Sequence, residues 1–398
     1  MKAATLVALM LSAGSISLYG QQSFQKEIQT KLIEAKEGEV IELPEGTFHL
    51  DVSLSLDDKR NVTLKGKGMD KTILSFAGQL SGAEGVKVTN SSNITLADFT
   101  VVDTKGDAIK TQLVDGITFK NVKAAWTNGP HRTNGGYGLY PVQCTNVLID
   151  GCVATGASDA GIYVGQSKYI IVRNSKAYEN VAGIEIENSL HADVHSNETF
   201  NNTGGILVFD LPDLIQKEGG HVRLFDNLVK ENNHDNFAPK GNIVAKVPPG
   251  TGIMILATRN VEVFENKIID NRSVGTAIIS YYMTENPIND STYKPFPSNI
   301  FVHHNVFERE RVRATGKGRF GKMFRFKLRF GKDVPHIMYD GIEDEKQPTR
   351  NICIRENKNS SFVDLDADHD FKGRNRNAQP FACEGDRIEP VVIVKAHD

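Results

Sequence analysis

Tyrosine, carboxylate and amide side chains recur at a spacing of 22 or 23 residues between positions 140 and 210. Tyr140 is followed 23 residues later by Tyr163, and Tyr163 is followed 22 residues later by Glu185. Tyrosine and glutamate transfer protons when their surroundings adjust their pKa. Beside a group that neutralises charge, such a base removes a proton adjacent to a carboxylate. The spacing therefore indicates a candidate proton-transfer site, if the chain brings the repeats together.

The candidate catalytic residues include two from a glycine-rich loop as well as two from the repeats. His131, Tyr163 or Glu185 is the candidate base, and Arg132 is the candidate charge neutraliser. A Ca²⁺ ion held by Glu187 and Asp210 is an alternative neutraliser, because carboxylates are preferred calcium ligands. Glu185 and Glu187 are also spaced closely enough to leave a hydrolase with paired carboxylates open.

The candidate substrate-binding residues are a tyrosine, whose face packs against a sugar ring, and amides, which bond hydroxyl groups: Tyr140, Gln143, Gln166 and Asn188. The competing interpretation is that outward glutamates on a strand are solvated surface and that the tyrosines only stack on one another. Both interpretations remain open at the level of the sequence.

The elements that position these residues are short, glycine-led apolar runs. Gly161-Ile162-Tyr163-Val164 opens one 22-residue unit, and Gly183-Ile184-Glu185-Ile186 opens the next. A fixed period of this size carried by short alternating runs is typical of a solenoid. The runs are too close together for crossover helices, so each unit is one coil of a parallel β-helix. Because side chains alternate along a strand, burial of the isoleucines directs Tyr163, Glu185 and Glu187 outward.

A second apolar run in each unit is followed by a small polar residue at a constant offset. In the later coils this residue is an asparagine, at positions Asn197, Asn227, Asn266, Asn305 and Asn357. Stacked asparagines bond one another's amides and the turn backbone, and so satisfy polar groups that would otherwise be buried unpaired. We expect an inward-facing asparagine ladder.

Insertions flank the glycine-led strands at 126–137, 211–220, 231–251 and 284–298, whereas a fifth, at 309–348, follows the second run. Insertions that gather on one side of a solenoid mark its working face. We expect the glycine-led strands to form the floor of a cleft walled by these loops. The alternation of Phe and Arg or Lys over 324–330 predicts an amphipathic hairpin on the side of the solenoid.

Length and composition fit one elongated, exported domain. Residues 1–20 have the pattern of a secretory signal peptide, and no later run is apolar enough to span a membrane, so we expect a periplasmic or secreted protein. Residues 21–39 are expected to form a capping helix, 40–365 the β-helix, and 366–398 a tail packed on the last coils. A Cys353–Cys383 disulfide that pins the tail is a hypothesis permitted by export.

The net charge of −3 argues against a nucleic-acid partner, although residues 309–332 form a locally basic segment that could attract a polyanion. The polar groove predicted above suits an anionic polysaccharide. An envelope protein is a further partner that we consider.

The coil pattern, the asparagines and the run Gly38 to Thr47 resemble right-handed parallel β-helix proteins of the pectin-lyase-like superfamily. Gly138-Leu-Tyr-Pro-Val-Gln-Cys, Ser158-Asp-Ala-Gly-Ile-Tyr-Val and Gly204-Gly-Ile-Leu-Val-Phe-Asp further resemble an exported bacterial β-helix family of unestablished function. The resemblance implies an all-β, single-stranded right-handed solenoid with an N-terminal capping helix. It leaves two hypotheses: a polysaccharide lyase or uronate epimerase, and a non-catalytic carbohydrate-binding or scaffold solenoid.

Overall fold

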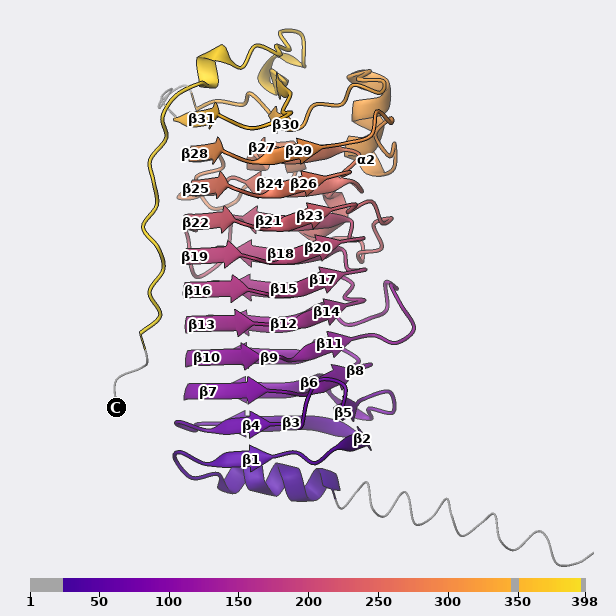
Figure 1. Ribbon diagram of the computed structural model, residues 1–398, viewed down its shortest axis with the longest axis vertical. Coiled ribbons are helices and arrows are strands. Elements are labelled where there is room, and N and C mark those ends of the chain that lie inside the picture. The colour runs from indigo at the N-terminus through magenta and orange to yellow at the C-terminus, as the bar shows by residue number, and fades with distance from the viewer. Residues whose placement is uncertain (1–23, 345–350, 395–398) are drawn as a thin grey trace, which may run out of the picture.

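The computed structural model describes residues 24–344 and 351–394, and the predicted signal peptide lies outside these ranges. The chain winds into coils, each of which contributes one strand to each of three parallel sheets (Figure 1). A helix over residues 24–34 lies across the first coil (Figure 1). Its face of Phe24, Ile28, Leu32 and Ala35 is buried, as the sequence predicts, so the helix covers the open end of the core.

Sheet A holds the second apolar run of each coil. Its strands, in spatial order, are β1 (Val40–Glu42), β4 (Thr63–Lys65), β7 (Ser92–Ala97), β10 (Asp115–Lys120), β13 (Thr145–Asp150), β16 (Lys168–Arg173), β19 (Leu190–His195), β22 (Gly220–Phe225), β25 (Arg259–Phe264), β28 (Ser298–His303) and β31 (Ile352–Arg355).

Sheet B was not predicted from the sequence. Most of its strands have three residues: β2 (Gly46–His49), β5 (Thr72–Ser75), β8 (Thr100–Val102), β11 (Lys123–Ala125), β14 (Val153–Thr155), β17 (Lys176–Tyr178), β20 (Glu198–Phe200), β23 (Leu228–Lys230), β26 (Lys267–Ile269) and β29 (Val306–Glu308). From β14 to β29 each strand buries a single side chain, for example Ala177 or Val229, and so shows no visible alternation.

Sheet C holds the glycine-led strands. They are β3 (Val52–Asp57), β6 (Ser81–Thr89), β9 (Ile109–Gln112), β12 (Tyr137–Val142), β15 (Ala160–Gly165), β18 (Ala182–Glu187), β21 (Gly204–Phe209), β24 (Thr251–Leu256), β27 (Val274–Ile279), β30 (Ile337–Tyr339) and β32 (Phe362–Asp364). The inward side chains of the three sheets form one continuous core, to which β15 contributes Ile162 and Val164.

The predicted asparagine ladder is confirmed. Asn197, Asn227, Asn266, Asn305 and Asn357 donate from one side-chain amide to the next at 2.9 to 3.0 Å. A second ladder, not predicted, joins Asn180, Asn202, Asn232 and Asn271 at 2.9 to 3.1 Å. Each of its last three members follows a member of the first ladder by five residues, so the sequence carried the signal.

Short helices lie in the insertions and the tail: the 3₁₀ helices η1 (Ile243–Lys246), η2 (Tyr281–Thr284), η4 (Ala367–His369) and η5 (Gln379–Phe381), the α-helix α2 (Gly318–Lys322) and the π-helix η3 (Met323–Lys327). The hairpin predicted for 324–330 is therefore wrong. Residues 324–327 belong to η3 and residues 328–330 follow it, and Phe324, Leu328 and Phe330 bury their side chains in the apolar cluster outside sheet C.

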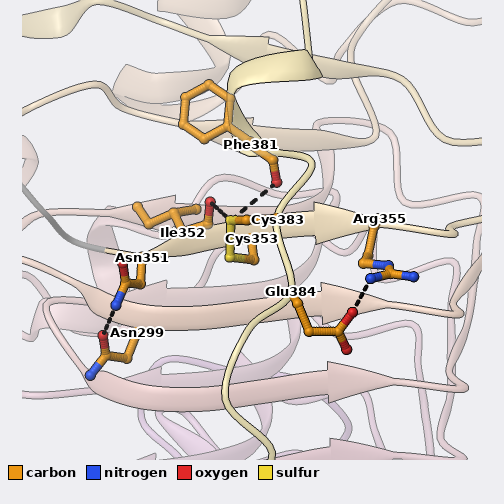
Figure 2. Close-up of a disulfide and its surroundings, with 8 residues drawn as sticks. All are labelled: Asn299, Asn351, Ile352, Cys353, Arg355, Phe381, Cys383 and Glu384. Atoms are coloured by element: carbon orange, nitrogen blue, oxygen red, sulfur yellow. Dashed lines mark hydrogen bonds and ion pairs between the residues drawn. A yellow bond between two sulfur atoms is a disulfide. The ribbon is translucent and has the colours of Figure 1, made fainter.

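The Cys353–Cys383 disulfide is confirmed, and it fixes the tail to β31 (Figure 2). Next to it, Glu384 pairs with Arg355. From there the chain extends along sheet A (Figure 1), where Arg387 Nη1 donates to Glu262 at 2.9 Å and Val394 N donates to Asn146 at 3.3 Å. The tail packs on the last coils through Phe381, and it also reaches much earlier coils.

Candidate functional site

The predicted outward residues of sheet C lie side by side. Tyr163 on β15 is the register partner of Glu185 on β18, and Gly165 is the partner of Glu187. All three side chains are nevertheless buried, with exposed fractions of 5% for Tyr163, 1% for Glu185 and 8% for Glu187. The expectation of an open groove at these coils is therefore corrected.

The insertions bury this face because they fold down onto it and form a second apolar core outside sheet C. This outer core includes Leu207, Phe209, Val244, Val247, Met254, Leu256, Tyr281, Phe324 and Leu328. The insertions were expected to wall a cleft on this side. They lie on the expected side. However, they cover the sheet from β18 towards the C-terminal coils, because the outward residues of β21, β24 and β27 are largely apolar.

Tyr163 and Glu187 form the best-defined polar contact of the site. Tyr163 Oη donates to Glu187 Oε1 at 2.6 Å. The ring reaches along its own strand because Gly165 has no side chain: a Cβ there would lie 2.4 Å from Tyr163 Cε1. Burial raises the pKa of Glu187 to about 7, against the lowering effect of the Tyr163 hydrogen bond. A carboxylate that titrates near neutral pH suits a general base.

Glu185 is the most unusual carboxyl of the cluster. Both of its carboxyl oxygens are buried, and neither has a hydrogen-bond partner among the described residues. Burial, together with the charges of Asp159 and Glu187, raises its pKa well above the usual value. These effects favour the protonated form of Glu185, and a buried neutral carboxylic acid can donate a hydrogen bond to an anion.

Asp159 extends the cluster towards the covering loop. Asn242 Nδ2, next to η1, donates to Asp159 Oδ2 at 2.7 Å and so attaches the 231–250 insertion to the cluster. Burial raises the pKa of Asp159 to about 7. Deprotonation of Asp159 and Glu187 in the same cluster therefore places like charges close together.

Three tyrosine rings connect the cluster to the surface. The centroid of Tyr137 lies 4.5 Å from that of Tyr140 and 4.3 Å from that of Tyr163. Tyr140 is partly exposed, and Lys110 Nζ lies 5.1 Å from its ring centroid. Such a cation over an exposed ring is attracted by the ring's quadrupole.

The row of strand-end residues Gln143, Gln166, Asn188 and Asp210 aligns as expected, but most of it holds an insertion in place. Asn188 accepts from Leu211 N at 2.8 Å and donates to Leu211 O, and Gln166 accepts from Ile215 N. Asn188 is 0% exposed, so the expectation that it faces a ligand is corrected. Gln143, bonded to Gln112 at 3.0 Å, remains partly exposed.

The glycine-rich loop leaves His131 and Arg132 exposed to solvent. His131 Nδ1 is hydrogen-bonded to Thr133 Oγ1 at 2.7 Å, within the same loop. Asn134 fixes the base of the loop by donating to Gly156 O at 2.7 Å. In the described part of the chain, the contacts of this loop tie it to the neighbouring coils, and none of them joins the His131 side chain to the buried cluster.

Sequence and structure comparisons agree on the fold. The family model described as "Right handed beta helix region" matches residues 84–242. The chain therefore has the fold of a right-handed parallel β-helix. No curated protein matches its sequence.

Solved β-helix structures align over most of the molecule. The A-module of the mannuronan C-5 epimerase AlgE4 from Azotobacter vinelandii is 14% identical with a TM-score of 0.52, over 85% of this chain and 90% of that chain. Endopolygalacturonase I from Stereum purpureum is 12% identical with a TM-score of 0.48, over 80% and 87%. At this identity the likeness to the epimerase shows the fold alone.

The calcium site expected at Glu187 and Asp210 of the β-helix does not fit the donor set. Glu187 accepts from Tyr163, and Asp210 Oδ1 accepts from Gly219 N at 2.9 Å. Across the described residues, no group of three or more His, Cys, Asp or Glu side chains is arranged to hold a metal ion. Calcium needs six to eight oxygen ligands, which these two carboxylates do not supply.

Two residues of the carboxyl cluster and its cover, Asp159 and Asn242, were not predicted from the sequence. Asp159 lies four residues before Tyr163. Because side chains alternate along a strand, this even spacing would have placed both side chains on the outer face. Asn242 gave no comparable signal, because its position depends on how the 231–250 insertion folds.

No helix in the described part of the chain is long and apolar enough to cross a membrane.

Proposed function

We propose that this protein is exported and acts on an anionic polysaccharide by removing the C5 proton of a uronate unit. The observation that supports this most is the Tyr163–Glu187 hydrogen bond beside the buried Glu185, whose raised pKa favours its neutral form. A base poised near pH 7 and a neutral acid in one dry site are the two groups that proton abstraction next to a carboxylate requires.

The proposed chemistry uses these three residues. Glu185 donates its proton in a hydrogen bond to the uronate carboxylate, which stabilises the negative charge that develops when C5 loses its proton. Tyr163 Oη takes the C5 proton while its own proton passes to Glu187. In an epimerase, a water molecule protonates C5 on the opposite face, and the proton held on Glu187 neutralises the resulting hydroxide. In a lyase, the C4–O4 bond breaks, Tyr163 donates its proton to O4, and Glu187 returns a proton to Tyr163.

Substrate reaches this site only if the covering contact gives way locally. Tyr163 is 5% exposed and Glu185 is 1% exposed, while Tyr140 is partly exposed. The Asn242–Asp159 hydrogen bond is the polar contact that holds the insertion over the cluster. We propose that a sugar unit docks against Tyr140 and displaces this contact.

Two further observations support export and a carbohydrate substrate. The first 20 residues have the pattern of a signal peptide, and the Cys353–Cys383 disulfide suits an oxidising compartment. The structurally similar AlgE4 module is described as a mannuronan C-5 epimerase. Because the shared fold does not determine the reaction, this likeness only raises the expectation.

The second candidate function is a non-catalytic carbohydrate-binding or scaffold solenoid that works beside an envelope partner protein. The deep burial of Glu185 favours it, because an inaccessible acid has no substrate to protonate. Under this alternative, the carboxyl cluster only joins the insertions to sheet C.

A panel of polyuronates tests the proposal. Purified wild type is incubated with polymannuronate, polyguluronate and polygalacturonate, with lyase activity followed by absorbance of the unsaturated product and epimerase activity by exchange in heavy water. Tyr163→Phe and Glu185→Gln are the test variants, and activity is expected to survive calcium chelation. Wild-type turnover that both variants retain in full would remove the assigned site, and no turnover on any polymer would favour the scaffold.

A further inference from the structure

The side chains on the outer face of sheet C change abruptly from exposed to buried along the molecule. One row of register partners runs Ser55 on β3, Lys87 on β6, Lys110 on β9 and Tyr140 on β12. All four side chains are partly or fully exposed. The row continues into Tyr163 on β15 and Glu185 on β18, which are buried. We call the exposed part, Ser55 to Tyr140, the open strip.

The open strip carries groups that suit a uronate chain. Lys87 and Lys110 are the cations of the row, and Tyr140 presents a ring at its end. Beside this row, Gln112 Nε2 bonds Gln143 Oε1 at 3.0 Å, and both amides are partly exposed. Lys110 has only a loose ion pair, with Glu84 at 4.0 Å, so its ammonium can bind a substrate carboxylate.

Beyond the cluster the same row is sealed. Leu207 on β21 is 0% exposed, and Met254 on β24 and Ala277 on β27, the next register partners, are buried. These residues belong to the outer core, together with Phe324 and Leu328 of the last insertion. A polymer lying along the row could pass Glu185 only by opening this apolar core. Local displacement of the 231–250 insertion, which is held by the Asn242–Asp159 hydrogen bond and by Val244 and Val247 in the outer core, would admit one unit but no continuous chain.

We propose that the site is blind at one end and binds a polyuronate by its terminus, with the reacting unit at or next to the chain end against Tyr163 and the following units along the open strip. The proposal rests on the proposed substrate class, but not on catalysis. It distinguishes this chain from a β-helix whose binding face is open along its whole length.

Binding stoichiometry tests the proposal directly. Size-defined polyuronates of several lengths are titrated with Tyr163→Phe protein, which keeps the sugar intact, and the complexes are measured by analytical ultracentrifugation. Binding to a terminus predicts one protein per chain at every length. Binding within the chain predicts a number of proteins that rises with length, and this result would overturn the inference while leaving the substrate class intact.

Paired lysine variants locate the binding surface. The double variant that carries Lys87→Ala and Lys110→Ala is expected to bind the polyuronate at least about tenfold more weakly, because each substitution removes a cation that pairs with a substrate carboxylate. Lys123→Ala, on β11 in the same coil as Lys110 but on sheet B, is the matched control and should bind as tightly as the parent. Equal loss in the control, or no loss in the double variant, contradicts the open strip. Absence of binding to any polyuronate overturns the proposed substrate class and this inference together.

Discussion

Gly165 decides where the Tyr163 ring lies, and so whether Tyr163 reaches Glu187. We predict that Gly165→Ala displaces the ring, because the new Cβ would stand 2.5 Å from Tyr163 Oη. Uronate turnover should fall about 100-fold, the scale of losing a positioned acid or base. Gly78→Ala is the matched control, since an added Cβ there meets nothing closer than 3.9 Å. Full activity in Gly165→Ala would separate Tyr163 from the reaction.

The buried carboxyls should also make stability depend on pH. The folded-state pKa values of Glu185, Asp159 and Glu187 are raised, so folding is favoured while these groups are protonated. That stability is complete at low pH and is lost as pH rises above their unfolded values, through about 7 for Asp159 and Glu187 and higher for Glu185. Glu185→Gln should therefore raise the melting temperature more at pH 8 than at pH 5.

Thermal unfolding of wild type, Glu185→Gln and the exposed control Glu34→Gln at the two pH values measures this effect. The melting temperature of the control variant should differ from that of wild type by the same amount at both pH values. A Glu185→Gln difference that is equal at pH 5 and pH 8, or larger at pH 5, would show that Glu185 is not held protonated in the folded protein.

At the scale of the elements, the asparagine ladder is the feature that the sequence predicts best. The ladder has a fixed offset from an apolar pair, and only stacking explains such an offset. Asn266 Nδ2 donates to Leu224 O and Asn305 Oδ1, and Asn266 Oδ1 accepts from Asn227. Asn266→Ala should destabilise the protein by about 3 kcal/mol, because it leaves buried backbone and amide groups unpaired.

Denaturant unfolding of Asn266→Ala measures that loss, with the exposed Asn128→Ala as the control. The control should stay within about 0.5 kcal/mol of wild type. A comparably small effect at Asn266 would mean that the ladder is not a significant source of stability.

The insertions mark the limit of sequence-based prediction at this scale. Their positions identify the working side of the solenoid, but their folded paths depend on which side chains of sheet C they meet. Phe209, Met254 and Leu256 create an apolar surface that draws Phe324 and Leu328 onto it. That pairing of distant segments converts the predicted cleft into a covered site, and no local pattern in either segment specifies it.

At the scale of the whole molecule, the C-terminal tail connects the last coils to much earlier ones. The disulfide at Cys353 fixes its start, and hydrogen bonds to Glu262, Asp193 and Asn146 hold its course along sheet A. The sequence predicts the disulfide but not this course, since the tail has no repeat.

Cys353→Ser should therefore lower the free energy of unfolding by about 3–4 kcal/mol, as expected for releasing a crosslink that spans 30 residues. Limited proteolysis should also cut the tail faster than in wild type. Wild type treated with reductant is the control and should match the variant. A variant as stable and as resistant as oxidised wild type would contradict a pinning role for the disulfide.

The central claim is that Tyr163, Glu187 and Glu185 together remove the C5 proton of a uronate. Release of tritium to water from a polyuronate labelled at C5 tests it most directly, because lyase and epimerase chemistry share that step and hydrolysis does not. Wild type should release the label, and Tyr163→Phe should release it about 100-fold more slowly. Release at the wild-type rate by Tyr163→Phe, or none from wild type that binds the polymer, would contradict the account.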